Sequence, residues 1–224
     1  MQTMTKTATT TRPALDDGAD SFLIWVQTHT RHIAIAAVIV VAFGLGGWLW
    51  RQSRVARERN ASIDLLTAAQ SLQTGNIALA QSDLEKLVAR YEGTNAAAQA
   101  ALELATIYYS QGQYDRGIAV LEQLAKSSDD GLVKAMAENG IAAGHEGAGR
   151  FADAAGHYRR AADLTRLPDE RDLYLANAAR AYQGAGNRAE AIALWRRLVE
   201  TEGPQAAEAR VRLGELSAEP AKQG

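Results

Sequence analysis

The chain has 224 residues, of which 47% are hydrophobic and 22% charged, and its formal net charge is −2. This near-neutral balance provides no basic surface of the kind that attracts nucleic acid, so nucleic-acid binding is not expected. The absence of cysteine excludes disulfides, thiolate metal sites and thiol redox chemistry.

The two ends of the chain differ from the rest in composition. Residues 1–21 are rich in threonine and lack apolar periodicity, which predicts a disordered tail, and residues 219–224 are predicted to form a second one. Residues 22–32 begin with the apolar cluster Phe-Leu-Ile-Trp-Val and end with polar and basic residues. We interpret 22–32 as a juxtamembrane segment that lies at a bilayer surface.

Residues 33–50 form an uncharged apolar run of 18 residues. As a helix this run extends about 27 Å, which just crosses the hydrocarbon core of a bilayer, and Trp25, Trp48 and Trp50 suit the interfacial belts. The alternatives are a buried core helix and a cleaved signal peptide. A stack of amphipathic helices needs no helix that is apolar all round, and the run is long for a signal peptide and lacks a cleavage motif after it. The sequence therefore predicts one transmembrane helix that is retained.

The rest of the chain repeats with a fixed period, because four glycines stand 37 residues apart: Gly75, Gly112, Gly149 and Gly186. An alanine precedes each glycine by seven residues, and a small residue follows it by five. A large apolar or aromatic residue follows by nine: Leu84, Leu121, Tyr158 and Trp195. This period indicates a helical hairpin copied four times. The glycine closes the first helix in a left-handed conformation, and the small residues let two helices approach closely.

Alanine-rich segments predict the first helix of each pair, at 56–73, 95–111, 131–147 and 169–185. The second helices are predicted at 76–91, 114–127, 151–165 and 188–201. Pro204 suits the first turn of a helix, which predicts a last helix through Ser217. The expected fold is all-α, with an N-terminal transmembrane helix followed by a right-handed α-solenoid of four helix pairs and a C-terminal capping helix. The repeat domain is predicted to extend over residues 51–218.

No set of side chains in the sequence predicts catalysis or metal binding. His29 and His32 flank the apolar run, and His145 and His157 are too few for a zinc site without cysteine. The glycine-rich stretch Gly140–Gly149 follows no strand, so it is no phosphate-binding loop, and we expect its interior glycines to loosen their helix. We predict a protein that is not an enzyme and that uses no cofactor.

The ordered recurrence of alanine, turn glycine, alanine and aromatic resembles the tetratricopeptide repeat (TPR) over roughly residues 56–203. This resemblance implies a partner-binding groove lined by first-helix residues that point away from the second helices. The groove positions of the family map onto Leu102, Thr106, Tyr109, Met136, Asn139, Arg180 and Gln183. We expect an apolar or mixed polypeptide ligand there, anchored by Tyr109 and Met136.

The chain begins with a tail, followed by an apolar helix ending in Gly-Gly-Trp-Leu-Trp at 46–50, an arginine-rich helix start and then the repeats. This order of parts resembles the ancillary SecYEG translocon subunit family. That resemblance implies a single-pass protein of the bacterial inner membrane with a cytoplasmic N-terminus and periplasmic repeats. It also implies partners among the translocon, chaperones and translocating polypeptides.

Two alternatives remain open at this point. The first is a cytoplasm-facing scaffold of another membrane complex, because four arginines directly follow the apolar run and favour the reverse orientation: Arg51, Arg54, Arg57 and Arg59. The second, from another functional class, is a regulatory subunit of an enzyme complex.

Overall fold

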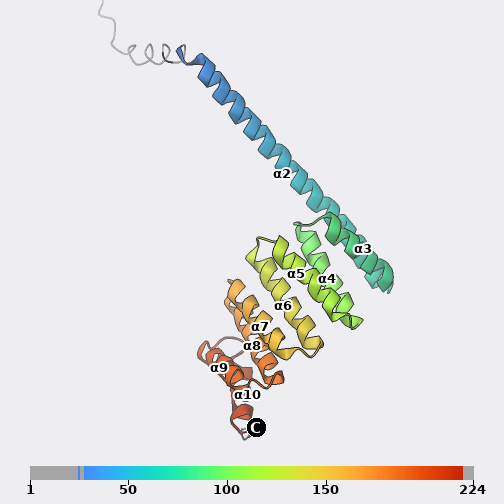
Figure 1. Cartoon of the computed structure of the whole chain (residues 1–224), viewed down its shortest axis with the longest axis vertical. Helices are drawn as coiled ribbons and strands as arrows, with labels where there is room; N and C mark the ends of the chain where they lie inside the picture. The colour runs from blue at the N-terminus through green and yellow to red at the C-terminus, as the bar shows by residue number, and fades with distance from the viewer. Residues whose placement is uncertain (1–24, 26–27, 219–224) are drawn as a thin grey trace, which may run out of the picture. The chain divides into compact units, whose positions relative to one another are not determined.

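The computed structural model describes Trp25 and residues 28–218, apart from the side chains at 32, 33 and 36–38. Regular secondary structure in this part of the chain is entirely helical (Figure 1). The helices are α2 (Thr30–Gln73), α3 (Ile77–Arg90), α4 (Asn95–Ser110), α5 (Tyr114–Ser127), α6 (Gly131–Gly147), α7 (Phe151–Leu164), α8 (Pro168–Gly184), α9 (Arg188–Glu200) and α10 (Ala206–Ala218). The predicted tails at 1–21 and 219–224 lie outside the described residues.

The chain divides into two compact units, Met1–Val55 and Ala56–Gly224, and α2 begins in the first and ends in the second. The helices predicted at 33–50 and 56–73 are therefore parts of one helix of 44 residues. No proline or glycine interrupts the segment between them, so nothing local ends the helix there.

The predicted transmembrane helix at 33–50 and the predicted inner-membrane localisation require correction. A membrane-spanning helix needs about 20 predominantly apolar residues. Among the residues that the structure describes, no helix combines the necessary length and hydropathy.

Two of the arginines that follow the apolar run, Arg54 and Arg57, make contacts within the chain. The Arg57 guanidinium lies 3.5 Å from the backbone carbonyl oxygens of Arg90 and Glu92, to which it donates at the C-terminal end of α3. The Arg54 guanidinium lies 4.1 Å from the centre of the Trp50 ring.

The second unit consists of four helix pairs and a last helix, in which consecutive helices from α3 to α10 pack against each other in chain order (Figure 1). The helix α4 also contacts α6, so neighbouring first helices meet. The bounds of α5 and α6 are those predicted. The last helix α10 begins at Ala206, and Pro204 lies in the turn before it rather than in its first turn.

The four turn glycines close the first helix of each pair, as predicted. Their φ angles lie between 71° and 77°, a region that side chains with a β-carbon rarely adopt. The residue after each glycine donates its N–H to a carbonyl five residues earlier, as Gln113 does to Tyr108 at 2.8 Å. This arrangement satisfies carbonyl groups that would otherwise lack partners at the helix end.

The periodic small and large residues form the core of the second unit. The alanines seven residues before the glycines are no more than 1% exposed: Ala68, Ala105, Ala142 and Ala179. Leu84 and Trp195, nine residues after their glycines, are fully buried. The small side chains thus allow close helix contact, and the large ones fill the space between successive pairs.

Three glycines of α6 lie close to large side chains of the preceding repeat. A β-carbon on each would lie within 2.5 Å of a side chain of the preceding repeat: Leu121 at Gly140, Tyr109 at Gly144 and Tyr114 at Gly147. These glycines receive large side chains from α4 and α5, because only a residue without a β-carbon leaves room. They fit α6 to the preceding repeat.

Candidate functional site

Three first helices, α4, α6 and α8, each expose one side, and the repeat period aligns equivalent positions on it. One row contains Gln99, Met136 and Leu173, and a second row lies seven residues further on: Thr106, Ala143 and Arg180. Seven residues are about two helical turns, so both rows lie on the same side of their helices. We call these six residues the first-helix face.

Met136 and Leu173 are the two large apolar side chains of the first-helix face. Their exposed fractions are 39% and 41%, although the residues directly before and after each of them are buried. Both side chains are therefore directed to solvent between buried neighbours. Exposed aliphatic and thioether groups of this kind can contact the apolar side chains of a partner.

Thr106 and Leu102, both predicted site residues, contact each other on α4. The Thr106 hydroxyl donates to the Leu102 carbonyl oxygen at 2.9 Å and remains exposed. The Leu102 side chain is half-buried and packs on the cluster of Ala105, Ile118, Leu121 and Ile141. Thr106 is therefore placed for contact, while Leu102 supports the helix that carries it.

Tyr109 connects α4 to α6. Its hydroxyl donates to the backbone carbonyl oxygen of Gly140 at 3.0 Å, and its ring centre lies 6.0 Å from that of Tyr114. Burial raises the pKa of the Tyr109 hydroxyl far above its ordinary range, so the group stays protonated and continues to donate. The structure thus places this predicted anchor in a joint between repeats.

The remaining predicted residues differ in their surroundings. Asn139 is half-buried on α6. Arg180 donates to the Glu208 carboxylate of α10 at 2.6 Å, and the Gln183 carbonyl oxygen accepts from the Trp195 ring N–H at 3.0 Å. Arg180 and Gln183 are therefore engaged within the chain.

Gln99 and Leu173 belong to the first-helix face but were not predicted. Each stands 37 residues from Met136, on either side of it in the sequence. The repeat period was therefore the signal that could have found them. Three residues of this face, Thr106, Met136 and Arg180, were among those predicted from the family's groove positions.

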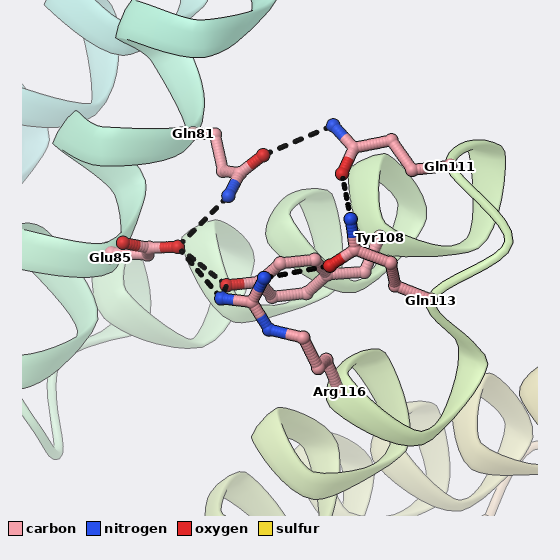
Figure 2. A network of polar contacts seen from close by, with 6 residues as sticks. All are labelled: Gln81, Glu85, Tyr108, Gln111, Gln113 and Arg116. Carbon is pink, nitrogen blue, oxygen red and sulfur yellow. Dashed lines mark hydrogen bonds and ion pairs between the residues drawn. The ribbon is translucent and has the colours of Figure 1, made fainter.

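A polar network fixes α3 against α4 and α5, and so fixes the start of this face (Figure 2). Arg116 donates to the Tyr108 hydroxyl at 2.8 Å, and Tyr108 donates to Glu85 at 2.5 Å. A second path runs from Arg116 through Gln113, Gln111 and Gln81 to the same carboxylate, with donor–acceptor distances of 2.7, 2.9, 3.1 and 3.1 Å. Both paths begin at a cation and end at an anion.

The charges at the ends of this network stabilise each other. The hydrogen bond from Tyr108 lowers the pKa of the Glu85 carboxyl most, Gln81 and the Arg116 charge lower it further, and burial opposes them. The Arg116 guanidinium also lies 4.3 Å from the centre of the Tyr108 ring. The first two repeats are thus joined by directed hydrogen bonds as well as by packing.

Within Trp25 and residues 28–218, no three side chains of the histidine or carboxylate types are grouped so that they could hold a metal ion. What the first-helix face offers is a surface for contact: two apolar side chains, the small Ala143, and polar groups around them.

The sequence matches two family descriptions. A tetratricopeptide repeat-like domain matches residues 24–163, which is more than half of the chain, and a tetratricopeptide repeat matches residues 176–219. No curated protein matches the sequence.

Solved structures with similar folds are also repeat proteins. TPR-like repeats described as those of a kinesin light chain of Podosopora anserina superpose with a TM-score of 0.56 at 22% identity, covering 71% of this chain and 86% of that one. MamA of Desulfovibrio magneticus RS-1 gives 0.54 at 16% identity, with coverages of 70% and 83%. BtubC of P. vanneervenii gives 0.55 at 17% identity, with coverages of 73% and 68%. At these identities the likeness concerns the fold alone.

TPR-like repeats generally serve as protein-interaction modules and are typically not enzymes. The comparisons confirm the resemblance to the tetratricopeptide repeat, and they do not confirm the resemblance to the ancillary SecYEG translocon subunit family. The chain belongs to the tetratricopeptide repeat-like domain family.

Proposed function

We propose that the protein is a non-enzymatic scaffold that binds polypeptides through its first-helix face. The repeat domain, which we place at 51–218, supplies this face. The observation that carries the proposal is the pair Met136 and Leu173, two exposed apolar side chains at equivalent positions on neighbouring first helices. Apolar contacts at the centre of a surface with polar groups around them are typical of protein interfaces.

The expected ligand is a polypeptide segment with apolar side chains. Met136 and Leu173 would contact those side chains, and Gln99 and Thr106 at the repeat-two end of the face would exchange hydrogen bonds with the backbone of the segment. Arg180 is held by Glu208, so its charge is balanced and gives no strong preference for an acidic ligand.

Three of the predicted site residues act indirectly in this proposal. Leu102 and Tyr109 hold α4 against its neighbours, and Gln183 holds α8 against Trp195. Substitution of Leu102, Tyr109 or Gln183 would change binding by moving the helices that carry the face. Asn139 is half-buried on α6, on the same helix as Met136.

Site-specific photo-crosslinking tests the proposal. A photoreactive phenylalanine analogue would replace Met136 or Leu173 in the full chain, and a reduced and alkylated polypeptide that cannot fold would be the ligand. Matched positions on the second helices are Ala119 of α5 and Ala193 of α9, which are also exposed. We expect crosslinks from the first pair of positions and few from the second.

Two results would contradict the proposal. One is equal crosslinking from both pairs of positions, and the other is unchanged affinity when Met136 and Leu173 are both replaced by aspartate while helix content is retained. A charged group at each position would have to be dehydrated against an apolar ligand, so the proposal requires a large loss of affinity.

A narrower form of the proposal names the polypeptides as components or clients of the SecYEG translocon. The order of parts in the sequence supports it. The test is copurification of the tagged chain with the translocon and its chaperones, compared with the variant that carries aspartate at Met136 and Leu173. If the translocon copurified with neither the unmodified chain nor the variant, this narrower form would be rejected and the general proposal would remain.

A further inference from the structure

The third repeat contains a cluster of histidines and charged residues that polypeptide binding does not use. His145 of α6 and His157 of α7 stack with their ring centres 5.0 Å apart, and their side chains are 16% and 17% exposed. Arg150, the residue before α7, lies against His145. Glu138 and Arg160 lie against His157.

The partner of His145 determines where its proton lies. The Arg150 Nε atom is 2.9 Å from the His145 Nδ1 atom. A guanidinium can only donate, so Nδ1 must accept, and the imidazole must be neutral with its proton on Nε2. The second arm of Arg150 donates to the Asp115 carboxylate of α5 at 2.7 Å. Neutral His145 therefore helps to hold an arginine that ties the third repeat to the second.

Charged groups surround His145 from α5, from α7 and from the turn before α7. His157 and Arg150 oppose a positive charge on it, whereas Asp153 of α7 and Glu122 of α5 favour one. The Asp153 carboxylate lies 3.9 Å from His145 Nδ1, beyond hydrogen-bonding distance. Burial lowers the pKa of His145 most, followed by the charges of His157 and Arg150, so the neutral form is favoured.

We propose that His145 is an acid-sensitive joint between the second and third repeats. A proton on Nδ1 removes the acceptor of Arg150 and places two cations side by side within a half-buried site. The contact between α5, α6 and α7 then opens. The proposal concerns the stability of this joint and does not depend on which partner the protein binds.

The direction of the pH effect follows from which state binds the proton more readily. The unfolded chain, in which histidine titrates near its ordinary value of about 6.5, binds it more readily than the folded chain. The stabilising contribution is therefore complete above about pH 6.5. It decreases as the pH falls from there towards the lowered value of the folded state, and the loss is complete below that value.

The first test is made on the full chain by nitrogen NMR of the histidine side chains. At about pH 7.5 we expect His145 to carry its proton on Nε2, and on acidification we expect its titration midpoint to lie below that of an exposed histidine. A proton on Nδ1 at neutral pH, or an ordinary midpoint, would overturn the proposal even if every substituted protein failed to fold.

The second test uses His145→Gln, because the glutamine carbonyl oxygen can accept from Arg150 and does not titrate. Amide hydrogen exchange at about pH 7.5 and about pH 5.5, corrected for the intrinsic pH dependence of exchange, would be compared between variants. We expect exchange in α6 and α7 to rise several-fold at the lower pH in the unmodified chain, to stay unchanged in His145→Gln, and to rise as before in the control His29→Gln. The same rise in His145→Gln would show that the joint does not depend on this residue.

Discussion

At the scale of single residues, the repeats are joined by aromatic rings that rest on glycines. Tyr114 and Phe151 occupy the same position at the start of α5 and α7, and each meets a glycine 33 residues later, Gly147 or Gly184. A β-carbon on these glycines would lie 2.5 Å and 2.8 Å from the rings. The same pairing at two successive joints lets the ring of one repeat contact the helix backbone of the next.

Replacement of Gly144 by alanine tests whether such close contacts stabilise the array. The new β-carbon would lie 2.5 Å from the Tyr109 hydroxyl oxygen and 2.7 Å from Ile118 Cγ1, so both side chains must move. Alanine favours a helix by up to about 1 kcal/mol over glycine, but overpacking costs about 1–3 kcal/mol. We expect a net loss in the free energy of unfolding, measured by urea denaturation.

The matched control is Gly156→Ala on α7, where the added β-carbon would meet only the Arg160 side chain at 3.9 Å. This substitution should leave stability unchanged or raise it, because helix propensity then acts alone. If Gly144→Ala stabilised the protein as much as Gly156→Ala, the close contact would have no energetic role.

The sequence predicted the places of residues that act within one hairpin better than the contacts of residues that join two repeats. The turn glycines and core alanines act within one hairpin, so their period and their small size were sufficient to predict their places. The contacts of Gly144 with Tyr109 and of Arg150 with Asp115 join different repeats. Their geometry depends on the angle between neighbouring pairs, which a period does not determine. The partner of Arg180, Glu208 of α10, lies outside its hairpin and was not foreseen for the same reason. The partner of Gln183, Trp195, lies in the same hairpin and was also missed, because the period places a side chain without giving its hydrogen bond.

At the scale of helices, the N-terminal part of the repeat domain is held by contacts to helix ends. The Glu58 carboxylate of α2 accepts hydrogen bonds from the backbone N–H groups of Asn95 and Ala96 at 2.9 and 3.0 Å, at the start of α4. The adjacent Arg57 donates to carbonyl oxygens at the end of α3. Each charge lies at the helix end that its sign stabilises. The two residues thus position α2 against the turn between α3 and α4.

The network between α3 and α4 makes a prediction about coupling. Tyr108→Phe removes the hydroxyl that donates to Glu85 and accepts from Arg116, and should lower the free energy of unfolding by about 1 kcal/mol. The side chains of Glu85 and Arg116 are 42% and 57% exposed, so solvent limits the effect. In a double-mutant cycle with Glu85→Gln we expect the two losses to be non-additive at neutral pH.

The coupling should also depend on pH. The pKa of Glu85 is lowered in the folded chain, first by the hydrogen bond from Tyr108, so its stabilising contribution is present above the ordinary carboxyl value and is lost as the pH falls through the lowered one. Tyr182→Phe is the control, because Tyr182 holds the same place in the fourth repeat but accepts from Arg159 at 3.3 Å. Additive losses for Tyr108 and Glu85 at every pH would contradict the coupling.

At the scale of the whole molecule, each repeat of the second unit is stabilised mainly by its neighbours, and α10 takes the place of a further repeat. Its residues Ala209 and Leu216 are buried in one cluster with Trp195 and Leu198 of α9. Glu208 of α10 forms the ion pair with Arg180. In stacked repeats, stability is approximately a sum of terms for each repeat and its nearest neighbours, so removal of the last helix should act locally first.

Deletion of residues 204–224 tests this argument, because it exposes the faces of Trp195 and Leu198 that α10 covers. We expect amide protection to fall most in α8 and α9, less in α6, and least in α3 and α4, as measured by hydrogen exchange. Leu216→Ala, which shortens a side chain that is 6% exposed, should give the same gradient with a smaller amplitude. This variant keeps the test decisive if the truncated chain unfolds completely. An equal loss of protection in every helix would mean that the array unfolds as one cooperative unit. Contacts between repeats such as those of Tyr109 and Arg150 would then outweigh the stability of the separate hairpins.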